Sequence, residues 1–114
     1  MVEIGEADWK VLKQVKTAAL ERACATALQE IRAASEAPGK TDHERYLGIW
    51  GLLRQRDGEL AAAFDDYRRS TALARLISLR QGGFLTDEGL SRFSAKTHEV
   101  LERVLPAFQY RGKR

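Results

Sequence analysis

Apolar residues in the first third of the chain recur at the spacing of an α-helix. Between about Glu6 and Ser35 they follow an i, i+3, i+4 pattern, which is typical of a helix with one face packed against the rest of a protein. The stripe consists of Trp9, Leu12, Ala19, Leu20, Ala23, Cys24, Ala27 and Ile31. Pro38 and Gly39 then interrupt the pattern, so we predict one helix over this segment and a loop at 36–41.

The next apolar stripe is longer and starts at a recognisable cap. Thr41 and Glu44 have the spacing of a capping box, in which each side chain accepts a hydrogen bond from the other residue's backbone N–H. Apolar positions then recur every seven residues, at Tyr46, Leu53, Leu60, Tyr67 and Ala74. A turn at Gly58 would shift the apolar positions out of this seven-residue phase, but the phase continues beyond Gly58. The pattern therefore predicts one helix over 42–80, with Gly58 as a point where it could bend, and a C-cap at the glycine pair 82–83.

A third helix is predicted after the two glycines. Thr86 has the place of its N-cap, and Leu85 and Leu90 have the spacing of a hydrophobic staple, in which residues on either side of the cap pack together. Ser94 is a second N-cap candidate, so the pattern is also compatible with a kink near Phe93.

The three segments predict an all-α protein: an antiparallel three-helix bundle with one long central helix. We expect a single helical domain over 1–105 and a basic C-terminal tail over 106–114. A helix of nearly forty residues would be about 60 Å long, roughly twice the diameter of a globule of this size. Part of its apolar stripe would then lie outside the bundle, and a second copy of the chain could cover it. We therefore expect a homodimer.

Composition limits the class of protein and the compartment that we expect. The chain has 114 residues, of which 44% are hydrophobic and 31% charged, as in globular rather than disordered proteins. Cys24 is the only cysteine, so no disulfide can form within the chain. The first residues lack the pattern of a signal peptide, and no apolar run approaches the roughly 20 residues that span a bilayer. These features lead us to expect a cytoplasmic protein without a membrane partner.

The sequence contains no motif typical of a metal, cofactor or catalytic site. His43 and Glu44 begin like a zinc-protease motif, but Leu47 occupies the position of its second histidine. His98 and Glu102 share a helix face, yet two ligands are fewer than the three or four that metal sites use. No glycine-rich phosphate loop or serine nucleophile motif occurs. We therefore predict no metal, no cofactor and no enzymatic activity.

Positive charge gathers in one stretch of the chain. Between Tyr67 and Thr86 there is no acidic residue, and the stretch contains Arg68, Arg69, Arg75 and Arg80. One interpretation is an anion-binding surface that contacts nucleic-acid phosphates together with the basic tail. The other is that cations near the end of a helix complement its dipole, which would account for Arg75 and Arg80.

Two charged residues fall within the apolar stripes. Asp57 lies near the centre of the second stripe, and Lys16 has the equivalent position on the first. Folding the two segments together across the loop would bring these side chains within about one helical turn of each other. We favour a buried ion pair that fixes the register of the helices, the alternative being a small polar ligand site.

Aromatic residues also recur at helical spacing, at Tyr46, Trp50, Phe64 and Tyr67. Such a stripe could line a ligand groove, but it is more typical of a core, and we expect these rings to be buried. The function that fits these features best is a small non-catalytic protein–protein interaction module or accessory factor, with a second copy or another protein as its partner. The alternative is a nucleic-acid-associated protein that uses the arginine-rich helix surface and the basic tail.

Overall fold

The computed structural model describes residues 4–105, and every regular element within them is helical. In chain order these elements are α1 (Glu6–Ser35), α2 (Asp42–Phe64), the short 3-10 helix η1 (Arg69–Thr71), α3 (Ala72–Gln81), α4 (Asp87–Ser91) and α5 (Ala95–Val104). The all-α fold class is confirmed. The described residues form five α-helices rather than three, and the predicted basic tail at 106–114 lies outside them.

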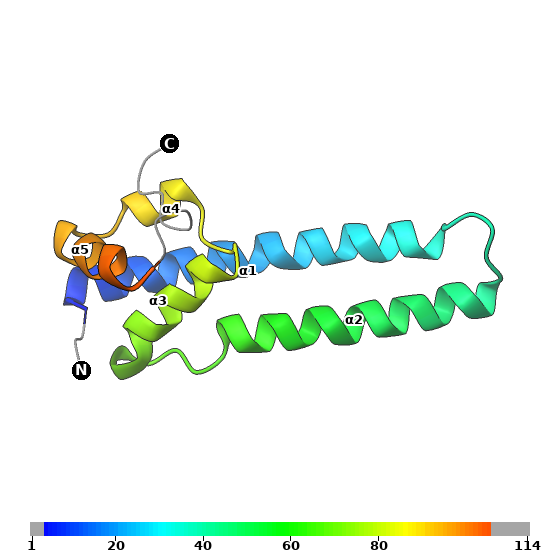
Figure 1. Cartoon of the computed structure of the whole chain (residues 1–114), viewed down its shortest axis with the longest axis horizontal. Helices are drawn as coiled ribbons and strands as arrows, with labels where there is room; N and C mark the ends of the chain where they lie inside the picture. Colours follow the sequence, from blue (N-terminus) through cyan, green and yellow to red (C-terminus); the bar gives the residue numbers. More distant parts are fainter. Residues whose placement is uncertain (1–3, 106–114) are drawn as a thin grey trace.

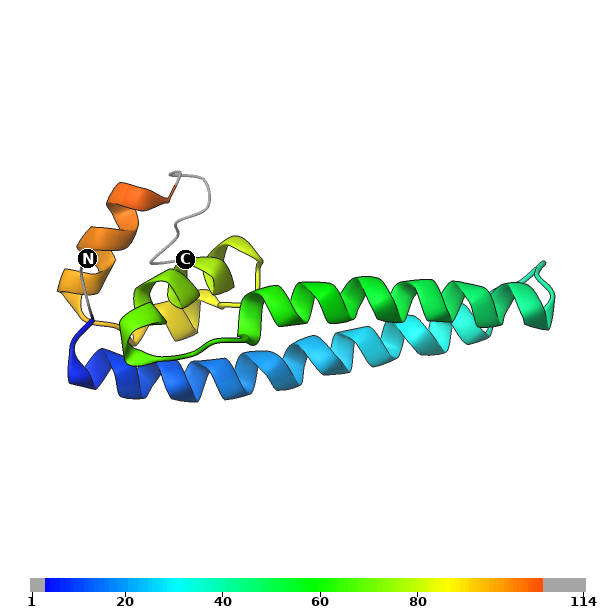
Figure 2. The ribbon, with the colours of Figure 1, turned by 90° about the horizontal axis from the view of Figure 1, so that it is seen from below.

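The molecule consists of a compact head and a projecting two-helix arm. α1 and α2 run antiparallel and side by side, and the smaller helices gather around the N-terminal part of α1 (Figures 1 and 2). We call residues 4–22 and 63–105 the head, and residues 23–62 the arm. The radius of gyration is 17.0 Å, whereas a globule of this length would have about 13 Å. The arm accounts for this elongation.

The hydrophobic core lies in the head. Leu12, Leu76, Leu79, Leu90 and Leu101 are its largest fully buried side chains. In the arm, by contrast, no residue between Ala19 and Ala63 is buried. The arm therefore has a contact between two helices but no closed core. No helix within residues 4–105 combines the length and apolar character needed to cross a bilayer.

The predicted helix over 42–80 is wrong, because α2 ends at Phe64. Asp65 takes an extended conformation and Asp66 a left-handed one, with φ of 64°, which aspartate tolerates better than most residues. The chain then turns back, and Thr71 stabilises the turn by donating a hydrogen bond to the carbonyl of Asp66 over 2.8 Å. The seven-residue phase misled because its next position, Ala74, is exposed on α3, which instead buries Ala72, Leu76 and Leu79.

Other expectations for the helix ends are confirmed. Both hydrogen bonds of the Thr41–Glu44 capping box are present, at 2.8 and 3.1 Å, and α2 runs through Gly58 without interruption. The glycine pair 82–83 caps α3, where Gly83 adopts a φ of 80° that few other residues would tolerate.

The last predicted helix is divided in two near the place where the sequence allowed a kink. Thr86 caps α4 by accepting a hydrogen bond from the backbone N–H of Gly89 over 2.9 Å. Ser94 then caps α5. Leu85 and Leu90, which have the spacing of a hydrophobic staple, are both buried in the core.

Candidate functional site

Two of the four arginines proposed to bind anions anchor the turn between α2 and α3. Arg68 pairs with the carboxylate of Asp66, with 2.8 Å between Nε and Oδ1. Arg69 reaches the N-terminus of α1, where it pairs with Glu6 over 2.7 Å and donates to the carbonyl of Ile4. Both guanidinium groups therefore contact acceptors within the chain.

The other two arginines also contact acceptors within the chain. Arg80, whose side chain is 8% exposed, pairs with Asp87 over 2.7 Å and donates to the carbonyl of Leu85 over 2.8 Å. Arg75 donates to the carbonyl of Ala62 over 3.2 Å. It thereby brings positive charge to the C-terminus of α2, whose last turn has no basic residue.

The structure does not bring Lys16 and Asp57 together, which corrects the predicted ion pair. Lys16 Nζ lies 4.5 Å from the centre of the Tyr67 ring, and Asp57 is exposed on α2. The two long helices are instead joined by Arg56 and Glu30, over 2.7 Å. In this register Asp57 is level with a point of α1 about thirteen residues, or roughly 20 Å, beyond Lys16. The hydrogen bond from Arg56 holds the pKa of Glu30 below its ordinary value.

A buried polar cluster joins the two ends of the described chain, and the sequence analysis missed it. The carboxylate of Asp8 accepts hydrogen bonds from the Ser94 hydroxyl at 2.7 Å, from the Ser94 backbone N–H at 3.0 Å and from the Thr97 hydroxyl. Burial raises the pKa of Asp8, but the hydrogen bonds from Thr97 and Ser94 outweigh it and hold this pKa below its ordinary value. The sequence contained one signal for this cluster. Asp8 lies four residues before Leu12 and therefore on the same buried face of α1.

Asp8 secures α5 against α1 rather than presenting a reactive group. Its two partners are the N-cap residue of α5 and the residue three positions later, so the carboxylate supports the capped end of that helix. Among the described residues, no group of three histidine, cysteine, aspartate or glutamate side chains could hold a metal ion.

Two hollows flank Phe84 where the arm meets the head. The larger, of about 460 Å³, lies between α2 and α3 and is lined mainly by Glu59, Ala62, Ser78 and Gln81. The smaller, of about 200 Å³, lies between α1 and α2. The Phe84 ring packs edge-on against Phe64, with 5.1 Å between ring centres. The geometry does not indicate a particular ligand for either hollow.

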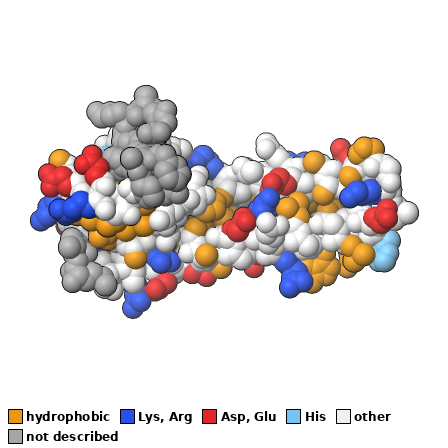
Figure 3. All heavy atoms as spheres, in the orientation of Figure 1, with side chains coloured by type: hydrophobic (Ala, Val, Ile, Leu, Met, Phe, Trp, Pro, Cys, Tyr) orange, Lys and Arg blue, Asp and Glu red, His pale blue; other side chains and the backbone are white. Residues whose placement is uncertain are grey.

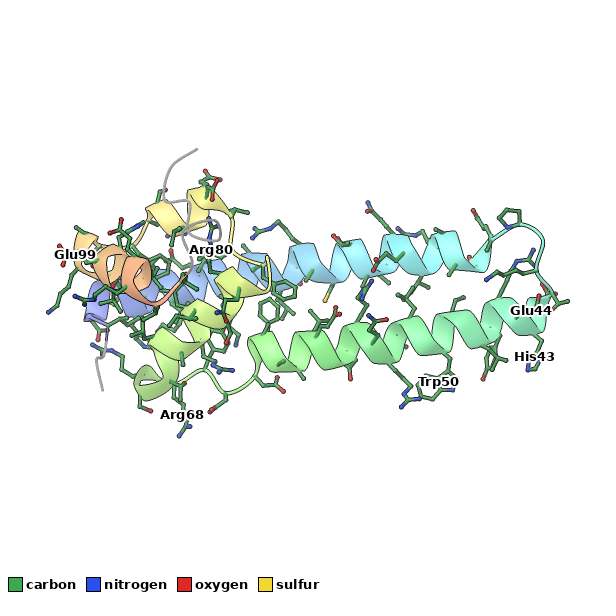
Figure 4. The ribbon with its side chains drawn as sticks, viewed as in Figure 1. His43, Glu44, Trp50, Arg68, Arg80 and Glu99 are labelled. Carbon is green, nitrogen blue, oxygen red and sulfur yellow. The ribbon has the colours of Figure 1, made fainter. Side chains whose placement is uncertain are left out.

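The most distinctive surface is on the arm, where the aromatic stripe divides between core and solvent. Phe64 is buried and Tyr67 half-buried, but Tyr46 and Trp50 are 64% and 51% exposed. The expectation that all four rings are buried is therefore wrong. Leu47 and Leu53 are also exposed beside Trp50. Figure 4 shows Trp50 and His43 on the side of α2 that points away from α1, and Figure 3 shows hydrophobic side chains along this edge.

These exposed residues form one face of α2, which we call the outer face. It consists of His43, Tyr46, Leu47, Trp50, Leu53, Arg54 and Asp57, all of which are exposed. At about 100° per residue they occupy an arc of about 120° centred on Trp50. The residues that pack toward α1, such as Ile49 and Leu60, are centred about 120° away on the same helix. The Arg54 guanidinium lies 5.1 Å from the centre of the Trp50 ring.

Comparison of the chain with protein-family models, with curated protein sequences and with solved structures finds no significant match. The function is therefore inferred from the residues and their geometry.

Proposed function

We propose that this protein is a non-catalytic protein–protein interaction module whose arm docks an amphipathic helix on its outer face. The observation that carries this proposal is the exposure of Tyr46, Leu47, Trp50 and Leu53 together on one face of α2. Exposed apolar residues are ordinary when scattered, but a contiguous aromatic and aliphatic patch is typical of a docking surface.

The chemistry of the face suits a helical partner. Tyrosine and tryptophan bury much apolar area with few rotatable bonds, and they are enriched among the residues that dominate binding energy. His43, Arg54 and Asp57 flank the apolar residues and would form a polar rim. A helix that presents i, i+3, i+4, i+7 anchors could follow this stripe along α2.

A protein partner is favoured over nucleic acid by the surroundings of the arginines. Arg68, Arg69, Arg75 and Arg80 each contact an acceptor within the chain. Binding a phosphate would require breaking these contacts, three of which involve half-buried arginines, Arg69, Arg75 and Arg80. The apolar side chains of the outer face are already exposed.

Site-specific photocrosslinking of the 114-residue chain tests the proposal. Benzoylphenylalanine replaces Trp50 in one variant and Gln55 in a control, where Gln55 is exposed about 140° around α2 from Trp50. In an extract of the source cells, we expect irradiation to join position 50, but not position 55, to a polypeptide of defined mass. Equal crosslinking at both positions, or none at position 50, would overturn the proposal.

A further inference from the structure

We infer that the helix docked on the outer face is α2 of a second copy of this chain, packed antiparallel about a twofold axis at Trp50. This inference rests on the proposed function and names the partner of the same face. It follows from the order of residues along that face, from the shape of the molecule and from the apolar side chains of α2 that α1 leaves exposed.

The outer face has a self-complementary sequence. Measured from Trp50, Leu47 and Leu53 lie three residues away on either side, and Tyr46 and Arg54 lie four residues away. In an antiparallel pair each of these positions meets its counterpart on the other copy, as an interface between identical subunits requires. Leucine then meets leucine, and the Arg54 guanidinium meets the ring of Tyr46, a favourable cation–π contact.

The ends of the face show the same symmetry in charge. His43 and Asp57 each lie seven residues from Trp50, so an antiparallel pair places an imidazole opposite a carboxylate at both ends. A parallel pair would instead place Asp57 opposite Asp57 and Arg54 opposite Arg54, and like charges repel. Charge therefore favours the antiparallel arrangement.

The shape of the molecule also favours antiparallel packing. The head begins about thirteen residues, or roughly 20 Å, from Trp50, whereas α2 begins at Asp42, eight residues or roughly 12 Å away on the other side. In an antiparallel pair the head of each copy lies beyond the tip of the other arm. In a parallel pair both heads would compete for the space at one end.

Pairing would also cover the apolar side chains of α2 that α1 leaves exposed. Burying the exposed parts of Tyr46, Leu47, Trp50 and Leu53 on both copies removes on the order of 1,000 Å² of surface from water, the lower limit for a specific interface. We therefore expect a dissociation constant in the micromolar range. Two helices from each copy would then form a four-helix arrangement.

Sedimentation equilibrium of the 114-residue chain measures the association directly. We expect a reversible dimer, at least a tenfold weaker association for Trp50→Glu, and unchanged association for the control Gln55→Glu. The helical circular dichroism of the monomeric Trp50→Glu variant should match that of wild type, because Trp50 is exposed on the arm. A wild-type monomer at 100 micromolar, on the order of a hundred times a micromolar constant, would overturn the inference.

Cysteine crosslinking tests the register. In a Cys24→Ala background, Leu47→Cys and Leu53→Cys chains are prepared separately and then mixed under mild oxidation. Antiparallel packing predicts crosslinks between the two kinds of chain in the mixture and few within either kind alone. Crosslinks of each variant to itself, at least as strong as those in the mixture, would show parallel packing and overturn the inference.

A charge exchange provides a second test of register. His43→Glu should weaken association at least threefold, because it opposes Asp57 of the other copy. Adding Asp57→Lys to the same chain should restore the affinity. The two positions lie about 21 Å apart along one helix, so this rescue can arise only across the interface, and its failure contradicts the proposed register.

The photocrosslink at position 50 separates this inference from the proposed function. A product of twice the chain mass supports both. A product containing another polypeptide, from a chain that sediments as a monomer, overturns the second copy as partner and leaves the proposed function standing. A lack of product at position 50 overturns both.

Discussion

At the scale of single residues, buried charges in the head join one helix to another. Asp8 is 5% exposed and links α1 to α5 through Ser94 and Thr97. Arg80 links α3 to the start of α4 through Asp87. A charge removed from water is tolerated when such partners replace its hydration. Removing only one partner leaves the other group buried and unsatisfied, which lowers the stability of the protein.

Replacing Asp8 with asparagine should lower the free energy of unfolding by about 1.5–3 kcal/mol, the usual contribution of hydrogen bonds to a charged group. Asparagine keeps the size of the side chain but presents an amide N–H₂ to hydroxyls that now donate to a carboxylate. Urea denaturation at pH 7 measures the change, with Glu99→Gln, at an exposed position of α5 outside the outer face, as a control. A loss no larger than that of the control would contradict the structural role of Asp8.

The same residue should make stability depend on pH. Because the pKa of Asp8 is lower in the folded protein than in the unfolded chain, its contribution is fully present above about pH 4. It is lost as the pH falls through the folded-state pKa. We therefore expect the stability difference between wild type and Asp8→Asn to shrink on acidification below about pH 4, and a difference that grew would have the wrong sign.

The arginines should differ in their contributions to stability. Arg80→Ala leaves Asp87 and the carbonyl of Leu85 without a buried donor, and we expect a loss of about 2–3 kcal/mol, below the usual range for a buried pair because Asp87 is partly exposed. Arg68→Ala removes a solvent-exposed pair and should cost less than about 0.5 kcal/mol. Thermal and urea denaturation of the two variants measure these losses of stability. Equal losses would contradict the buried role of Arg80.

At the scale of elements, local interactions set the two ends of α2. Between those ends the helix is continuous, because no tertiary contact favours a break. The capping box at Thr41 fixes its start, and the left-handed Asp66 follows its end. Gly58 lies in the helix interior, and a methyl group added there would meet nothing within 4 Å. Glycine weakens a helix at such a position without providing a turn.

Gly58→Ala should therefore stabilise the protein by about 0.5–1 kcal/mol, the difference in helix propensity. Gly83→Ala should have the opposite effect and cost about 1 kcal/mol or more, because its backbone is left-handed with φ of 80°. Unfolding curves of the pair check both signs. A destabilising Gly58→Ala would indicate a bend at that residue.

At the scale of the whole molecule, stability should be distributed unevenly. The head closes a core around Leu76 and Leu79, whereas the arm between Ala19 and Ala63 contains no buried residue. Helices without a closed core rely on propensity, caps and surface pairs such as Arg56 with Glu30. Local opening should therefore start in the arm.

Native-state hydrogen exchange measures this gradient. In dilute protein, the amides of α2 should exchange faster than those of α3, because opening the arm exposes little buried surface. Raising the protein concentration through the micromolar range should slow exchange in α2 and leave α3 unchanged, since pairing would cover the outer face. Uniform protection of both helices in dilute protein would contradict the division into head and arm.

Much of the fold could be predicted because its signals are local. The start and end of α1, the caps at Thr41 and Thr86 and the C-cap at Gly83 each depend on residues within about one turn of each other. The aspartate pair at 65–66 was an equally local signal for the end of α2. It was outweighed by a seven-residue phase that α3 continues only by coincidence.

The sequence by itself determined that this chain is helical and where most of its helices begin. It also indicated more apolar surface than one small bundle can bury, but on the basis of a helix over 42–80 that α2 does not form. Only the tertiary structure decided which stripe is buried, because Ile49 and Leu60 compete with Tyr46 and Trp50 for the same position against α1. That choice, like the meeting of Asp8 with Ser94, depends on helix packing between residues far apart in sequence, which local periodicity does not encode.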